Sequence, residues 1–141
     1  MGEVRFLLDT NVFSELSKEE PNRRVLSRFH QHRLAVACCA PVLHELQFGV
    51  LRLLEGERRN KLWNFVNGLL DEGIETLPYD RKAAEIHARE RAKSAAKGIL
   101  WPTVDGQIAA IAVANETALV TRNMGDFRRF PGLRLADWFG T

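Results

Sequence analysis

The chain has 141 residues, of which 45% are hydrophobic and 27% are charged, a composition typical of one soluble globular domain. A chain of this length buries enough apolar surface to form a core without disulfides, which argues against disorder as its main state. Its 20 Lys and Arg residues exceed its 18 Asp and Glu residues by only two, a balance that neither requires nor excludes nucleic acid as a partner. We therefore expect one domain over residues 1–141.

The cysteine and histidine pattern argues against a zinc site. Cys38 and Cys39 are adjacent in an apolar run, so they are predicted to be reduced core residues of a cytoplasmic protein. No CxxC pair occurs, and the four histidines are scattered along the chain. The N-terminal residues do not resemble a secretion signal, and no apolar run approaches the length of a membrane span. The expected localisation is therefore cytoplasmic, with no membrane partner.

The hydrophobic pattern predicts strands that alternate with helices. The predicted strands cover Val4–Leu8, Leu34–Cys39, Ile74–Leu77, Ala118–Thr121 and Leu133–Leu135, the last as a short edge strand. The predicted helices cover Pro21–His32, Val42 to about Leu54, the region of Leu62–Leu70, Arg81–Lys97 and the small-residue run Ile108–Ala114. Strands and helices in this order form right-handed βαβ units. The predicted fold class is α/β, with a central, mostly parallel sheet flanked by helices.

Four acidic residues lie at the places where a parallel sheet forms its ligand site, beyond the carboxyl ends of the strands. Asp9 ends the first strand, and Glu45 lies in the first turns of the helix after the second strand. Asp105 introduces the small-residue helix, and Asp126 lies in a predicted loop, residues 122–126, after the strand that ends at Thr121. If these carboxylates converge, their mutual repulsion requires a compensating charge, for which a divalent cation is the usual choice.

The candidate ligands are hard oxygen atoms with no thiol or imidazole partner, which favours Mg²⁺ or Mn²⁺. An open site of this kind is suited to phosphodiester hydrolysis, because the metal activates the attacking water and neutralises charge on the phosphate. Hydrogen bonds from nearby polar side chains could orient the carboxylates, the water or the phosphate. The predicted supporting residues are Thr10, Asn11, Thr121 and Asn123.

Each acidic residue also has a purely structural interpretation. Asp9 could cap a helix, Asp105 could complement a helix dipole, and Asp126 could be a turn residue. Glu45 could be a solvated side chain on the flank of its helix. The chain would then be a non-catalytic α/β interaction module. Another alternative is a phosphatase with Asp9 as nucleophile, but that chemistry typically needs a second acid at position 11, which is Asn. Nucleotide-binding folds are disfavoured because neither GxGxxG nor GxxxxGK[ST] occurs.

Four segments together resemble the PIN-domain ribonucleases, specifically the VapC-type and FitB-like toxins of type II toxin-antitoxin systems. These segments are Asp9–Asn11, Pro41–Gly49, Val104–Ala110 and Thr121–Phe127. The resemblance extends from the first predicted strand to the last, and no acidic position departs from the family pattern.

The resemblance implies an α/β PIN fold with Mg²⁺ or Mn²⁺ held by four carboxylates. It assigns the ligands to Asp9, Glu45, Asp105 and Asp126, and it makes Thr121 the neighbouring hydroxyl. It further implies cleavage of RNA and inhibition by a cognate antitoxin whose C-terminal segment occupies the cleft. Such antitoxins usually carry a DNA-binding part, so the complex is expected on operator DNA. A homodimer is also implied, and the apolar helices around Leu46 to Leu70 are predicted to supply a dimer surface.

Overall fold

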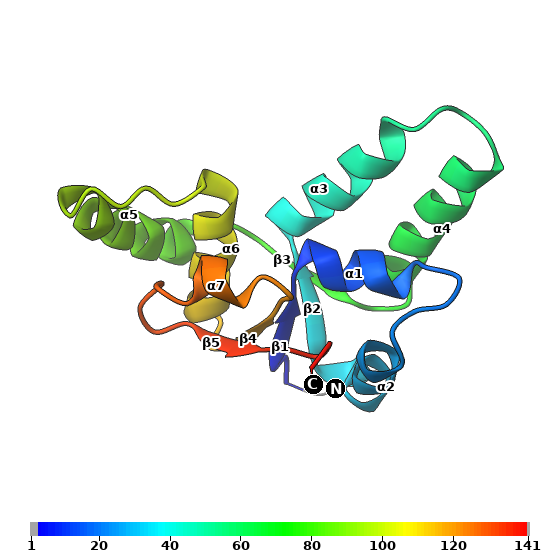
Figure 1. Ribbon diagram of the computed structural model, residues 1–141, viewed down its shortest axis with the longest axis horizontal. Helices are drawn as coiled ribbons and strands as arrows, with labels where there is room; N and C mark the ends of the chain where they lie inside the picture. The colour runs from blue at the N-terminus through cyan, green and yellow to red at the C-terminus, as the bar shows by residue number, and fades with distance from the viewer. Residues whose placement is uncertain (1–2, 141) are drawn as a thin grey trace.

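A five-stranded, fully parallel β-sheet forms the centre of the structure, a computed structural model that describes residues 3–140 (Figure 1). The strand order is β3-β2-β1-β4-β5. The strands are β1 (Phe6–Leu8), β2 (Val36–Cys39), β3 (Glu75–Leu77), β4 (Ala118–Val120) and β5 (Arg134–Ala136). The predicted α/β class with a central parallel sheet is confirmed, and the last predicted strand is indeed an edge strand.

Seven α-helices flank the sheet within the described residues. They are α1 (Thr10–Leu16), α2 (Arg23–Gln31), α3 (Ala40–Leu51), α4 (Glu57–Asp71), α5 (Arg81–Ala96), α6 (Thr103–Ala114) and α7 (Met124–Phe127). A single 3₁₀ turn, η1 (Arg33–Ala35), precedes β2. Figure 1 shows α1 to α4 on one side of the sheet and α5 to α7 on the other, as right-handed crossovers require. Across residues 3–140, no helix combines the length and apolar character needed to span a membrane.

The core lies between the central strands and the helices. The β1 residues Leu7 and Leu8 and the β4 residues Leu119 and Val120 are fully buried, as expected for strands covered on both faces. The small side chains of α6 are also buried, which confirms the prediction of an internal helix. Cys38 and Cys39 are free and buried in β2, as predicted, and burial raises the pKa of both thiols to about 12.

The prediction that the first helix begins near Pro21 is wrong. Helix α1 begins at Thr10, directly after β1, and a separate helix α2 begins at Arg23. Helix α1 has only seven residues, so its apolar positions do not repeat often enough to show a helical period. Its buried residues Val12, Phe13 and Leu16 nevertheless form one face against the core.

Several predicted boundaries are also wrong. The second strand begins at Val36 rather than Leu34, because its pairing with β1 starts at the Phe6–Val36 register and Leu34 is 81% exposed. Helix α3 ends at Leu51, and Leu54 is 92% exposed beyond it. Helix α4 begins at Glu57, before the predicted helical region of Leu62–Leu70.

The strand order places a topological switch point between β1 and β4. From β1 the chain proceeds outward through β2 to β3, and it then crosses back to add β4 on the other side of β1. In open parallel sheets, ligands bind beyond the carboxyl ends of the strands at such a point. Leu8 pairs with Val120, so the next residues, Asp9 and Thr121, leave the sheet side by side at this edge.

Candidate acidic active site

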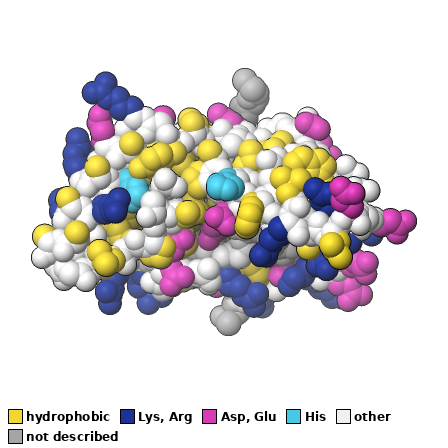
Figure 2. Space-filling model, turned by 90° about the horizontal axis from the view of Figure 1, so that it is seen from above, with side chains coloured by type: hydrophobic (Ala, Val, Ile, Leu, Met, Phe, Trp, Pro, Cys, Tyr) yellow, Lys and Arg dark blue, Asp and Glu magenta, His cyan; other side chains and the backbone are white. Residues whose placement is uncertain are grey.

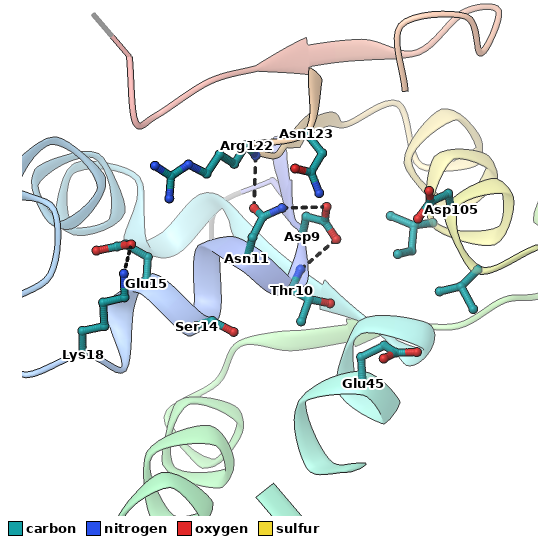
Figure 3. A pocket seen from close by; sticks show the side chains of 12 residues that line it. Asp9, Thr10, Asn11, Ser14, Glu15, Lys18, Glu45, Asp105, Arg122 and Asn123 are labelled. Atoms are coloured by element: carbon teal, nitrogen blue, oxygen red, sulfur yellow. Dashed lines mark hydrogen bonds and ion pairs between the residues drawn. The ribbon is translucent and has the colours of Figure 1, made fainter. Parts of the chain in front are cut away.

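A cleft of about 610 Å³ lies at the switch point, at the carboxyl edge of the sheet (Figure 3). Helix α1 and its cap residue Asp9 form one wall of the cleft, and α3 and α6 form others. The loop after β4 borders the cleft with Arg122 and Asn123. The lining residues are Asp9, Thr10, Asn11, Ser14, Glu15, Lys18, Glu45, Val104, Asp105, Ile108, Arg122 and Asn123.

Asp9 is the most firmly held acidic residue of the cleft. Its backbone N–H donates to the Val120 carbonyl at 2.9 Å, and its residue surface is only 6% exposed. Its Oδ1 accepts from the Thr10 N–H at 2.8 Å, and its Oδ2 accepts from Thr121 Oγ1 at 2.8 Å and from Asn11 Nδ2 at 3.3 Å. Asp9 therefore caps α1 and faces the cleft with the same carboxylate.

Thr121 joins the ends of β1 and β4 into one network. Its side chain is fully buried, and its Oγ1, besides donating to Asp9, accepts from Asn11 Nδ2 at 3.3 Å and from the Asn123 N–H at 3.0 Å. The Asn11 Oδ1 in turn accepts from the Arg122 N–H at 3.1 Å. The structure thus brings together Asp9, Thr10, Asn11, Thr121 and Asn123.

Burial and repulsion disfavour the charged forms of two of the carboxylates. Burial raises the pKa of the Asp9 carboxyl, the hydrogen bonds from Thr121, Thr10 and Asn11 oppose that rise, and the charge of Asp126 adds to it. The pKa of Asp105 is raised by burial and then by the charges of Asp9 and Asp126. Asp9, Asp105 and Asp126 therefore lie within electrostatic range of one another.

The other predicted carboxylates lie around Asp9 at different depths. Asp105 is half-buried in the first turn of α6 and Glu45 is exposed on α3, and both line the cleft. Asp126 does not lie in a loop as predicted but in α7, where it is exposed and borders a small gap that Asp105 also borders. Within residues 3–140, no group of three acidic, histidine or cysteine side chains is close enough to hold one metal ion.

The donor set nevertheless fits a hard divalent cation. The cleft offers carboxylate, hydroxyl and amide oxygens, which are the atoms that Mg²⁺ and Mn²⁺ prefer. A cation between Asp9 and Asp105 would offset the burial and repulsion that raise the pKa values of both groups. A Mg²⁺ site commonly uses only one or two carboxylates with several waters.

Six residues that line the cleft were not predicted as site residues, and four of them are polar or charged. Ser14, Glu15 and Lys18 belong to α1 or follow it, and Arg122 follows Thr121. Thr10, Ser14 and Lys18 are spaced four residues apart, a signal that becomes readable only once α1 is recognised. Glu15 is buried, and its carboxylate accepts from Lys18 Nζ and from the Asn22 N–H, both at 2.9 Å. The Lys18 hydrogen bond is the main cause that lowers the pKa of Glu15.

The sequence is similar to a family and to several characterised toxins. A family model described as PIN domain matches residues 6–133. The tRNA(fMet)-specific endonuclease VapC of Salmonella typhimurium is 32% identical over 135 residues, which cover 96% of this chain and 98% of VapC. Toxin FitB of Neisseria gonorrhoeae is 34% identical over 128 residues, covering 86% of this chain and 89% of FitB.

Solved structures show the same fold. The DNA-bound VapBC complex of Salmonella typhimurium contains a chain with a TM-score of 0.85 and 30% identity, covering 96% of this chain and 98% of that one. A chain of FitAB bound to the IR36 DNA fragment has a TM-score of 0.83 and 29% identity, covering 96% of both chains.

Proposed function

Because the chain belongs to the PIN domain family, we propose that it is a VapC-type ribonuclease toxin that hydrolyses RNA phosphodiester bonds with Mg²⁺ or Mn²⁺. Relatives that match over nearly their whole length carry the names of ribonucleases and toxins. The observation that carries the proposal is the buried Asp9 carboxylate, held by three donors at the switch point and facing Asp105 and Glu45 across the cleft.

The residues that would hold the metal are Asp9, Glu45 and Asp105, with Asp126 beside them. When bound, a divalent cation lowers the pKa of water and neutralises negative charge that develops on phosphate. Asp9 and Asp105, the two carboxylates whose pKa values are raised, would then be stabilised in the ionised form.

The chain's own polar residues fix the geometry of the cleft. Thr121 and Asn11 orient Oδ2 of Asp9, and the Thr10 N–H orients Oδ1, so the carboxylate has little rotational freedom. Arg122 places positive charge at the cleft, whereas the charge of Lys18 is paired with Glu15. The Arg122 cation favours the approach of a phosphodiester backbone that the carboxylates would otherwise repel.

The expected partners follow from the same relatives. Chains with this fold and about 30% identity occur in VapBC and FitAB complexes bound to DNA. We therefore propose a cognate antitoxin as the protein partner of this chain, and operator DNA as the ligand of the resulting complex.

The proposed site is tested by thermal melting of metal-free protein with and without Mg²⁺ or Mn²⁺, together with RNA cleavage. At a metal concentration about a hundred times the Kd, binding to the native state adds about 2.7 kcal/mol to the free energy of unfolding. Asp9→Asn should lose this stabilisation and RNA cleavage while keeping the fold, because its shape is nearly unchanged. Without metal, its melting temperature should stay close to that of the wild type, because removal of the buried charge offsets the hydrogen bond lost when one accepting oxygen becomes a donating amide.

The matched control is Asp71→Asn, which makes the same chemical change at the exposed end of α4. This variant should retain both the metal-dependent shift and the cleavage. An Asp9→Asn protein that cleaves RNA as well as the wild type would rule out the site.

A further inference from the structure

A hollow outside the acidic cleft is lined by three arginines. Arg23, Arg24 and Arg28 of α2 form one side of a cavity of about 460 Å³, and Asp137, Trp138 and Gly140 form the other. All three arginines are exposed. Within the described part of the chain, none of them forms an ion pair. We call this cavity the arginine hollow.

Two of these arginines occupy positions that are electrostatically unfavourable for the helix. Arg23 and Arg24 lie in the first turn of α2, which contains no acidic residue. The N-terminus of a helix carries a partial positive charge, so cations there destabilise it. Asn22 already caps the helix, since its Oδ1 accepts from the N–H groups of Arg24 and Val25 at 2.9 and 3.1 Å. The groups left to meet a ligand are therefore the guanidinium groups.

The opposite wall of the arginine hollow is fixed but does not neutralise the arginines. Trp138 is only 4% exposed and packs edge-on against Phe6, with ring centroids 5.5 Å apart. Asp137 Oδ1 accepts from the N–H groups of Phe139 and Gly140 at 2.9 and 3.3 Å. The Asp137 carboxylate thus stabilises its own turn, and no ion pair joins it to α2 within residues 3–140.

Arg122 connects the arginine hollow to the acidic cleft. It lines the cleft, and its guanidinium carbon lies 4.8 Å from the ring centroid of Phe139, the neighbour of Trp138. Figure 3 shows the Arg122 side chain directed away from Asp9. On the face drawn in Figure 2, Lys and Arg side chains lie along the lower edge and at the left, and acidic side chains lie near the centre and at the right.

We propose that the arginine hollow binds backbone phosphates of the RNA strand whose scissile bond lies in the acidic cleft, with Arg122 between the two sites. The inference rests on the proposed function. Guanidinium groups bind phosphate oxygens in a bidentate manner, and a row of them leading to a cleft fits a polyanion better than a single small anion. Phosphate contacts supply most of the sequence-independent affinity for nucleic acid.

The test compares two triple variants with the same change in charge. Arg23→Gln, Arg24→Gln and Arg28→Gln together remove the three guanidinium groups from the arginine hollow. The control replaces three exposed α5 and α5-flanking cations that form no ion pair within residues 3–140, as Lys82→Gln, Arg89→Gln and Lys97→Gln. The probe is a fluorescently labelled single-stranded RNA of mixed sequence, titrated by anisotropy at several NaCl concentrations in EDTA.

Loss of three phosphate contacts should reduce the slope of log affinity against log salt by about 2, from about 0.7 for each contact to a single strand. The slope should change only in the α2 variant. Its melting temperature should stay close to that of the wild type, because removal of the unfavourable first-turn charges of Arg23 and Arg24 offsets loss of the favourable last-turn charge of Arg28. Equal slopes for the two triple variants would overturn the proposal, and so would a change seen with duplex DNA but not with RNA.

Cleavage of the same RNA with Mg²⁺ separates this inference from the proposed function. If the wild-type protein cleaves the RNA and the α2 variant binds it as tightly as the wild type, only the proposed role of the arginine hollow would be overturned. If RNA binding is weaker in the α2 variant but the wild-type protein does not cleave the RNA, the result would support phosphate binding by the arginine hollow and count against the proposed ribonuclease activity. A wild-type protein that neither binds nor cleaves the RNA would overturn both.

Discussion

Asp9 both caps α1 and presents its carboxylate to the acidic cleft. Its Oδ1 accepts from the first backbone N–H of α1, and its Oδ2 is held by Thr121 and Asn11 within the cleft. The positions of Asp9, Glu45 and Asp105 at the sheet edge could be predicted because strand ends are readable from apolar runs. Thr121 could be predicted as a supporting hydroxyl, but its hydrogen bond to Asp9 in particular could not, because that bond depends on β1 and β4 being neighbours.

Thr121→Val should weaken the site without changing its shape. The substitution removes the hydroxyl that donates to Asp9 and accepts from the Asn123 N–H. Leaving buried polar groups unpaired costs roughly 1–3 kcal/mol of unfolding free energy each. The pKa of Asp9 should rise further, because the Thr121 hydrogen bond lowers it. Chemical denaturation measures the loss of unfolding free energy, and metal-dependent melting measures the weakening of the site. Thr121→Ser keeps the hydroxyl and should retain most of the stability and most of the metal-dependent shift.

His87 should make stability depend on pH. This residue is buried against α6, and its Nδ1 shares a hydrogen bond of 2.9 Å with the Tyr79 hydroxyl. Burial, and then the charge of Arg91, lowers the pKa of His87 below its ordinary 6.5. The unfolded chain therefore binds the proton more readily, so this contribution to stability is present above pH 6.5 and is lost as the pH falls below it.

The measurement is the melting temperature of the wild type and His87→Gln across this range of pH. The difference between the two proteins should shrink as the pH falls, because only the wild type has the imidazole. A difference that stays constant would show that His87 is equally protonated in the folded and unfolded states. His32, whose pKa is also lowered, is present in both proteins and cancels in the comparison.

At the scale of elements, the predictable features are those with long or wholly apolar signals. The central strands, the small-residue helix α6 and the edge position of β5 were all readable from the sequence. Helices α1 and α7 were missed because they have seven and four residues, fewer than the two turns a helical period needs. Two unpredicted cleft residues, Ser14 and Glu15, belong to α1, so the missed helix accounts for them.

The packing of α5 against α6 should depend on Gly106. A Cβ at this position would lie 2.3 Å from His87 Nε2, and His87 is buried and bonded to Tyr79. Gly106→Ala should therefore displace the start of α6, which carries Asp105, at a cost of roughly 1–3 kcal/mol in unfolding free energy. Weaker metal-dependent stabilisation should accompany this loss.

Gly68→Ala in α4 is the matched control, because a Cβ there meets no other atom within 4 Å. It should stabilise the protein by up to about 1 kcal/mol, as expected for alanine in a helix. Combining His87→Ala with Gly106→Ala should cost less than the sum of the two single changes. Strict additivity would show that the close contact is not the cause.

For the whole molecule, the dimer surface on the helices around Leu46 to Leu70 stays a prediction. The structure shows which apolar side chains of this region are exposed and can therefore be used to test it. Phe48 and Leu51 near the end of α3 are 55% and 50% exposed. Replacing both by Ser should reduce self-association, as measured by light scattering at micromolar concentration. Leu100→Ser, at an 85% exposed site elsewhere, should leave association unchanged. A wild-type protein that is monomeric at these concentrations would remove the prediction.

The strand order also has a consequence for how the protein emerges from the ribosome. Thr121 Oγ1 donates to an Asp9 carboxylate 112 positions earlier in the chain, and β4 pairs with β1, which is synthesised well before it. Until β4 arrives, one edge of β1 has no neighbour, and the acidic cleft lacks both Thr121 and Arg122. A nascent chain therefore cannot complete its cleft before β4 and Arg122 have been synthesised, and a chain that terminates before Thr121 never completes it.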